Sequence, residues 1–174
     1  MEGLMRALPM ILLAALCATS AQARQKEVLS WGKAGVSFDA YRSDAATCGR
    51  QGYYLDIADT QAVTTLKAAT RQLDANEAAL QSAAMTGELS RVMDITASSA
   101  HIVEGARPDQ RFAELRTMMT DKVAACLSQL GYTQFRLTPA QRSKLKHLKQ
   151  GSPERHAYLH ALGSNPMVLA NQAV

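Results

Sequence analysis

Residues 60–85 read TQAVTTLKAATRQLDANEAALQSAAM, and this stretch decides the fold class. Its apolar residues recur at alternating intervals of three and four, which predicts one long helix starting near Asp59 or Thr60 and running to about Met85. The same spacing is typical of a short coiled-coil seam. The predicted stripe consists of Val63, Leu66, Thr70, Leu73, Glu77, Leu80 and Ala84.

The segments after this helix continue the helical pattern. Gly87 marks a break or kink, after which Leu89, Val92, Met93, Thr96 and Ala100 keep helical spacing. Residues 101–109 contain a glycine and a proline, so we expect a loop there. The next helix carries Phe112, Leu115, Met119, Val123, Cys126 and Leu130, and we expect it to end at Gly131 with Tyr132 folded back on its last turn.

Shorter helices are predicted on either side of this central part. Ser37 can cap a helix with apolar positions Phe38, Tyr41, Ala45 and Cys48. Near the carboxyl end, Thr138-Pro139 and Ser152-Pro153 each open a short helix, closed before Gly151 and at Gly163. Aromatic residues make up only 5% of the 174 residues, which favours helices over sheets. We therefore predict an all-α, disulfide-pinned bundle of about five to six helices with two short C-terminal helices.

The amino-terminal segment, residues 1–23, has the pattern of a signal peptide. Arg6 supplies a positive charge, residues 7–18 are nearly all apolar, and Ala21-Gln22-Ala23 fits the small-x-small cleavage site. The apolar run is shorter than the roughly 20 residues that a transmembrane helix needs. Lipid attachment at Cys17 is disfavoured because Leu16 stands where a small residue is required. We expect cleavage after Ala23, a periplasmic or secreted location, and a single helical domain over 24–174 with a flexible lead over 24–36.

Two cysteines remain after such cleavage, Cys48 and Cys126. An even count in an exported chain predicts one disulfide, and each cysteine falls on an apolar helical stripe. The bridge should therefore join the first helix of the mature chain to the fourth. The alternative is a pair of buried free thiols.

Charge is distributed unevenly along the chain, whose net charge is +4. From Arg136 to the end, six basic residues stand against Glu154 alone. The basic helical pair spans 138–163, and Arg142, Lys146 and Lys149 are spaced to share one helix face. Such a face suits an anionic envelope surface or another envelope protein. The alternative is an ordinary solvated surface; nucleic acid is a poor fit, because export removes it and no aromatic residues interleave the patch.

Three histidines offer a weak alternative, a metal site. His156 and His160 are four residues apart on one predicted helix, and His147 lies on the preceding one. No carboxylate or cysteine stands at a defined ligand spacing, so we predict no metal site and no cofactor.

No enzyme motif occurs in the chain, neither a strained serine turn nor a phosphate loop nor a Cys-x-x-Cys pair. Glu77 is an unusual residue for a seam position. A buried carboxylate with a raised pKa would suit acid catalysis of glycoside cleavage, whereas an acid at such a position more often fixes helix register or pairs at the rim. A cell-wall hydrolase stays as an alternative on this residue alone.

Residues 28–56, VLSWGKAGVSFDAYRSDAATCGRQGYYLD, and residues 126–163, CLSQLGYTQFRLTPAQRSKLKHLKQGSPERHAYLHALG, carry a resemblance. The Trp-Gly-Lys-x-Gly lead and the late Cys followed by Gly-Tyr resemble small uncharacterised exported proteins of alphaproteobacterial type. The resemblance implies the exported compartment and the pairing of Cys48 with Cys126, and it implies no activity. The sequence thus predicts a non-catalytic envelope protein with a structural or binding role.

Overall fold

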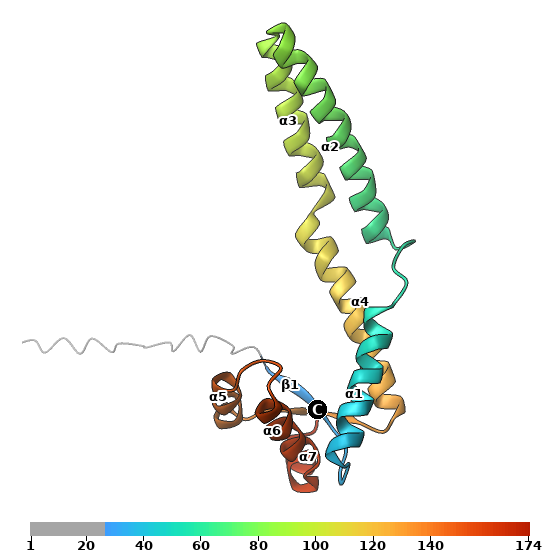
Figure 1. The fold of residues 1–174 in the computed structure, drawn as a ribbon, viewed down its shortest axis with the longest axis vertical. Helices are drawn as coiled ribbons and strands as arrows, with labels where there is room; N and C mark the ends of the chain where they lie inside the picture. Colours follow the sequence, from blue (N-terminus) through green and yellow to red (C-terminus); the bar gives the residue numbers. More distant parts are fainter. Residues whose placement is uncertain (1–26) are drawn as a thin grey trace, which may run out of the picture.

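A computed structural model describes residues 27–174 and shows a long helical hairpin standing on a smaller base (Figure 1). Helices α1 (Phe38–Tyr53) and α2 (Gln61–Thr86) form one arm, and α3 (Leu89–Ala106) and α4 (Pro108–Gln129) form the returning arm. Gly87 makes the turn between the arms with a φ of 74°, a left-handed conformation that glycine adopts without strain. The all-α fold class is confirmed.

The outer part of this structure is the α2–α3 hairpin, and alanine, leucine and isoleucine side chains form most of its inner seam. Asn76 near its middle donates hydrogen bonds to Ser98 (3.3 Å) and Ser99 (3.0 Å). The residues that α2 and α3 turn toward each other follow heptad spacing and are at least half-buried. This seam consists of Ala62, Leu66, Ala69, Leu73, Asn76, Leu80 and Ala83 on α2 and Val92, Ile95, Ser99, Ile102 and Ala106 on α3.

The predicted stripe on α2 is therefore only half right. Its leucines lie in the seam, whereas Thr70, Glu77 and Ala84 are exposed because each follows a seam residue by one position. One residue is 100° around a helix, so these side chains point out of one side of the hairpin.

The loop predicted over 101–109 is wrong. Helix α3 continues to Ala106, and Arg107 alone separates it from α4, with a left-handed φ of 47°. Its backbone N–H caps α3 by bonding the Val103 carbonyl at 3.2 Å. Pro108 then occupies the first turn of α4, where the missing N–H has no helical partner to lose. Arg107 alone therefore connects the two helices where a loop was expected.

The base begins where α1 packs on the second half of α4. The Cys48–Cys126 disulfide joins these two helices, with the Cα atoms 5.5 Å apart, so the predicted bridge is confirmed. Gly52 lets the helices approach closely, since a Cβ there would meet Val123 Cγ2 at 2.5 Å and the Met119 carbonyl oxygen at 2.8 Å. Together these contacts hold the two arms in contact below the hairpin.

The end of α4 is closed by the turn that the sequence predicts. Gly131 is left-handed with a φ of 82°, and Tyr132 donates its N–H back to the Leu127 carbonyl at 3.0 Å. The Tyr132 side chain is buried beside the disulfide, and its hydroxyl donates to Asp44 Oδ2 at 2.9 Å. Burial, followed by this bond, raises the pKa of Tyr132 well above its usual range, and burial also raises the pKa of Tyr41.

A two-stranded ribbon, which the sequence analysis did not predict, completes the base. Strand β1 (Leu29–Gly32) pairs antiparallel with β2 (Thr133–Arg136), with Ser30 opposite Phe135. Residues 29–32 of the lead predicted over 24–36 thus belong to a strand. The signal peptide predicted for residues 1–23 lies outside the described residues.

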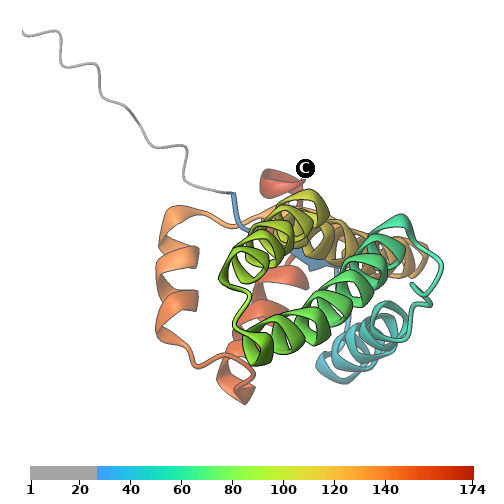
Figure 2. The ribbon, with the colours of Figure 1, turned by 90° about the horizontal axis from the view of Figure 1, so that it is seen from above.

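Three short helices pack around this ribbon: α5 (Pro139–His147), α6 (Pro153–Gly163) and α7 (Pro166–Gln172). Both predicted proline-opened helices are present, and α5 has the full capping box of Thr138 and Gln141. Fully buried Phe135 is the centre of their core, with Leu137 and Leu145 around it. In the view from above, α5 and α1 lie on opposite sides of the base (Figure 2).

Candidate contact surfaces

The basic face predicted on the C-terminal pair of helices forms only in part. Helix α5 ends at His147, so Lys149 follows the helix instead of extending its face. Arg142 is half-buried and lines a hollow with Glu27 and Arg136. Lys146 and Lys149 remain exposed. Arg142 and Lys146 line a second hollow together, so the structure removes only Lys149 from the helix face that the spacing predicted.

Several other cations of this region have partners within the base. Arg155 donates to the carbonyl oxygens of Leu145 (2.6 Å) and Leu148 (3.4 Å), which satisfies the C-terminal end of α5. Lys144 Nζ lies 4.6 Å from the centre of the Tyr158 ring, and Arg136 pairs with Glu27 at 3.1 Å. Much of the positive charge in 136–174 therefore holds the short helices in place.

The three histidines do not converge. His160 lies against the rings of Phe38 and Tyr41, and its Nε2 is 2.8 Å from the Val36 carbonyl oxygen, an acceptor to which that nitrogen must donate. His147 Nδ1 is similarly placed 2.7 Å from the Ser143 carbonyl oxygen. Within residues 27–174, no three His, Cys, Asp or Glu side chains lie close enough to share a metal ion. His160 thus packs in the base against α1.

Glu77 is exposed on the side of α2. The hydrolase alternative depended on a buried carboxyl, because removal from water is what raises the pKa of an acid catalyst. The exposed position removes that argument.

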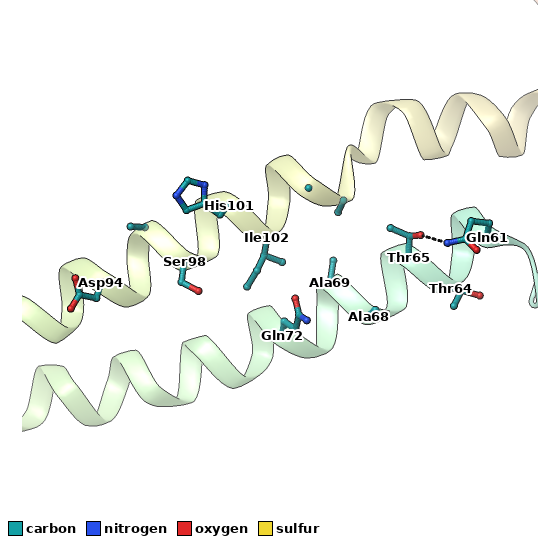
Figure 3. Close-up of a pocket in the computed structure, with 13 residues that line it drawn as sticks. Gln61, Thr64, Thr65, Ala68, Ala69, Gln72, Asp94, Ser98, His101 and Ile102 are labelled. Carbon is teal, nitrogen blue, oxygen red and sulfur yellow. Dashed lines mark hydrogen bonds between the residues drawn. The ribbon is translucent and has the colours of Figure 1, made fainter.

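A shallow groove runs along one side of the α2–α3 hairpin (Figure 3). Most residues that line it precede a seam residue by one position, as Thr65, Ala68 and Gln72 do on α2, and three seam residues, Ala69, Ile102 and Ala106, also line it. Small residues form its floor, among them Ala69, Gly105 and Ala106, and polar side chains border it, among them Gln61, Gln72, Asp94, Ser98 and His101. From Gln61 to Gln72 it follows α2 for about 16 Å, or three helical turns.

The opposite side of the same hairpin is apolar along α3 and carries both apolar and polar residues along α2, and we call it the uncovered face. It is formed by residues that follow the seam by one position, together with Leu89 at the tip and Phe112 at the start of α4. Leu89 is 71% exposed, Met93 65% and Phe112 52%. Beside Phe112, a shallow hollow is lined by Val63, Leu66, Lys67, Thr70, Arg71 and Leu115. The uncovered face consists of Val63, Lys67, Thr70, Asp74, Glu77, Gln81, Ala84, Leu89, Met93, Thr96, Ala100, Val103 and Phe112.

Sequence reasoning missed the groove, although a signal for it was present. The small residues Ala62, Ala69 and Ala83 recur every seven or fourteen positions and mark where α2 and α3 approach closely. Because Val63 is more apolar than Ala62, the predicted stripe contains Val63 and continues one position after these alanines.

The comparisons with known proteins add no family to this description. No family model matches the chain, and neither the curated proteins nor the solved structures contain a match. Within residues 27–174, no helix is long and apolar enough to cross a membrane.

Proposed function

We propose that this protein is an exported, non-catalytic envelope protein whose base presents the α2–α3 hairpin to a helical segment of another protein. The observation that carries the proposal is the groove along a hairpin that projects beyond the base (Figures 1 and 3). Small residues on the floor let a helix backbone approach closely, and the polar border offers hydrogen-bond partners on both sides.

Export to the periplasm is part of the same proposal. Two features support it: the signal-peptide pattern of residues 1–23 and the Cys48–Cys126 disulfide, a bond that persists in oxidising compartments. Amino-terminal sequencing of protein recovered from the periplasm should find Arg24 as the first residue. A mature chain that retains residues 1–23, or that is found only in the cytoplasm, would contradict export.

A second candidate contact is the basic end of the chain. Lys146 in the last turn of α5 and Lys149 just after this helix are both exposed, and they suit an anionic envelope component. Two cations give weak, salt-sensitive binding, so this surface ranks below the groove.

Site-specific photo-crosslinking in the bacterial envelope separates the two candidates. Benzoylphenylalanine replaces Ala68 in the groove, Lys146 on α5, or Ala78, an exposed alanine of α2 outside the groove. We expect one dominant protein adduct from position 68 and none from position 78. The adduct should disappear when Ala97 on the opposite wall is changed to Arg.

Other outcomes count against the groove. Adducts from position 146 alone would assign the contact to the basic end, and equal labelling from positions 68 and 78 would show no preferred surface.

A further inference from the structure

The apolar part of α3 is wider than the contact with α2 requires. Val92, Ile95, Ser99, Ile102 and Ala106 face α2. A second set, Leu89, Met93, Thr96, Ala100 and Val103, has intervals of four, three, four and three residues, which is heptad spacing in its own right. A helix with two adjacent apolar seams is typical of bundles in which it touches two neighbours, and here only one neighbour is present.

We propose that the uncovered face binds a second copy of this chain, with the two hairpins face to face and their tips at the same end. The resulting structure is a four-helix bundle about a two-fold axis parallel to the hairpin. This inference does not depend on the helical partner proposed for the groove, because the groove lies on the other side of the hairpin.

Such an axis keeps every residue at the same height in both copies, so the height of each residue decides what it meets. Asn76 bonds to Ser98 and Ser99, which fixes the heights of α2 and α3 relative to each other. Residues equally far along the two antiparallel helices from the Asn76–Ser98/Ser99 contact lie at the same height. Met85 therefore lies at the height of the Leu89–Met93 turn, and Val63 at the height of Phe112. In the paired molecule the apolar tips therefore meet each other, and the apolar residues near the base do the same.

Charges on the two edges of the face support the same arrangement. Lys67 and Arg71 form no ion pair or hydrogen bond with any other residue in 27–174, and both line the hollow beside Phe112. Arg71 is level with Glu104, whose side chain is 83% exposed and has only a 3.8 Å contact with His101. No ion pair joins Arg71 to Glu104 within one copy, whereas pairing brings Arg71 of each copy beside Glu104 of the other.

Two acids, Asp74 and Glu77, lie in the centre of the uncovered face. The height of Glu77 places it opposite the small Thr96 and Ala100 of the second copy, where the Thr96 hydroxyl can donate to it. A polar group in an interface with apolar neighbours fixes register at a cost in affinity. Glu77→Leu should therefore tighten the pairing.

The available area is sufficient for a stable dimer. Helix α2 has 26 residues and is about 39 Å long, and two adjacent helices are about 20 Å wide, so each copy offers on the order of 800 Å². A standard specific interface buries about this area on each partner.

Sedimentation velocity of the disulfide-bonded mature chain tests the proposal. We expect a dimer at tens of micromolar, and Met93→Lys should weaken pairing by roughly tenfold or more because two cations then enter the apolar face. Ala97→Lys is the matched control, since Ala97 lies on the same helix but lines the groove. A wild-type monomer at all concentrations, or equal loss of pairing in both variants, would overturn the proposal.

Two further measurements remain informative if Met93→Lys disturbs folding. Arg71→Glu should weaken the dimer, and adding Glu104→Arg should restore it; no restoration would contradict the proposed contact. Spin labels at Ser90→Cys near the tip should lie much closer together than the ~39 Å length of α2. A separation near that length would show the tips at opposite ends and contradict the arrangement.

Discussion

The base and the α2–α3 hairpin are both built from helices, yet they are stabilised in different ways. The base has a covalent bridge, fully buried Phe135 and close glycine contacts. The hairpin has a single seam of alanine and leucine with a polar centre at Asn76, and both of its broad sides are exposed. The difference shows that contacts within the chain concentrate in the base, which leaves the hairpin surface available for other molecules.

Removing the disulfide should have the largest effect. Cys126→Ala, with Cys48→Ala to avoid a free thiol, removes a crosslink across 78 residues, for which chain entropy predicts a loss of about 4.5 kcal/mol, less any native strain. Urea unfolding of the variant and of the oxidised wild type measures the difference. If the two proteins unfold at the same urea concentration, the bridge does not stabilise the base.

A glycine in each region gives opposite expectations for the same substitution. Gly52→Ala places a methyl group against Val123 and the Met119 carbonyl, so we expect a loss of about 1–3 kcal/mol from overpacking. Gly105→Ala meets no atom within 4 Å in a helix of the hairpin and should stabilise by roughly 0.5–1 kcal/mol. Thermal unfolding of both variants checks the pair; a stabilising Gly52→Ala would show that α1 and α4 do not touch as described.

The Tyr132 hydroxyl predicts a smaller, pH-dependent effect in the base. Tyr132→Phe loses the hydrogen bond to Asp44, worth about 1 kcal/mol. The pKa of Tyr132 is raised in the folded state, so its stabilising contribution is complete below the unfolded pKa near 10 and declines as the pH rises above that value. The urea midpoint should therefore fall between about pH 8 and about pH 10.5, and it should fall less in Tyr132→Phe than in wild type. An equal fall in both proteins would show that Tyr132 does not cause this pH dependence.

The exposed lysines should matter least for stability. Changing Lys146 and Lys149 to Gln should alter the free energy of unfolding by less than about 0.5 kcal/mol, because neither side chain is packed in the base. Co-sedimentation with anionic vesicles at low and high salt then tests the basic end alone. We expect little wild-type protein to pellet; strong salt-sensitive binding that the double variant loses would make this region the contact surface.

The sequence predicted the helices and their ends well, because capping residues and helical periodicity are local signals. Ser37 and Thr138 cap helices as expected, Thr60 caps the helix predicted to start near Asp59 or Thr60, and the cysteine positions identified which two helices are joined. Periodicity left the phase of the α2 seam uncertain by one residue, since Leu66 and Leu73 fit two neighbouring stripes equally well. That single step decides whether Glu77 is buried or exposed.

The missed features depend on contacts between distant residues. Strand β1 has only four residues, and its partner β2 lies about a hundred positions later, so no local pattern announces the pairing. Gly105 and Pro108 predict a loop at 101–109, yet Gly105 lies within α3 and Pro108 is well tolerated at the start of α4. The groove and the uncovered face were also missed because each is formed by two helices together, and no local pattern shows which residues of two helices lie side by side.

Hydrogen–deuterium exchange at several protein concentrations tests most directly whether the base is the stable support and the hairpin the contact element. The account predicts slow exchange in α1, the second half of α4 and the β1–β2 ribbon at every concentration. In dilute protein α2 and α3 should exchange faster by local opening, and they should slow as concentration rises and the uncovered face becomes buried. Equal protection of base and hairpin in dilute protein, or a hairpin unaffected by concentration, would contradict the account.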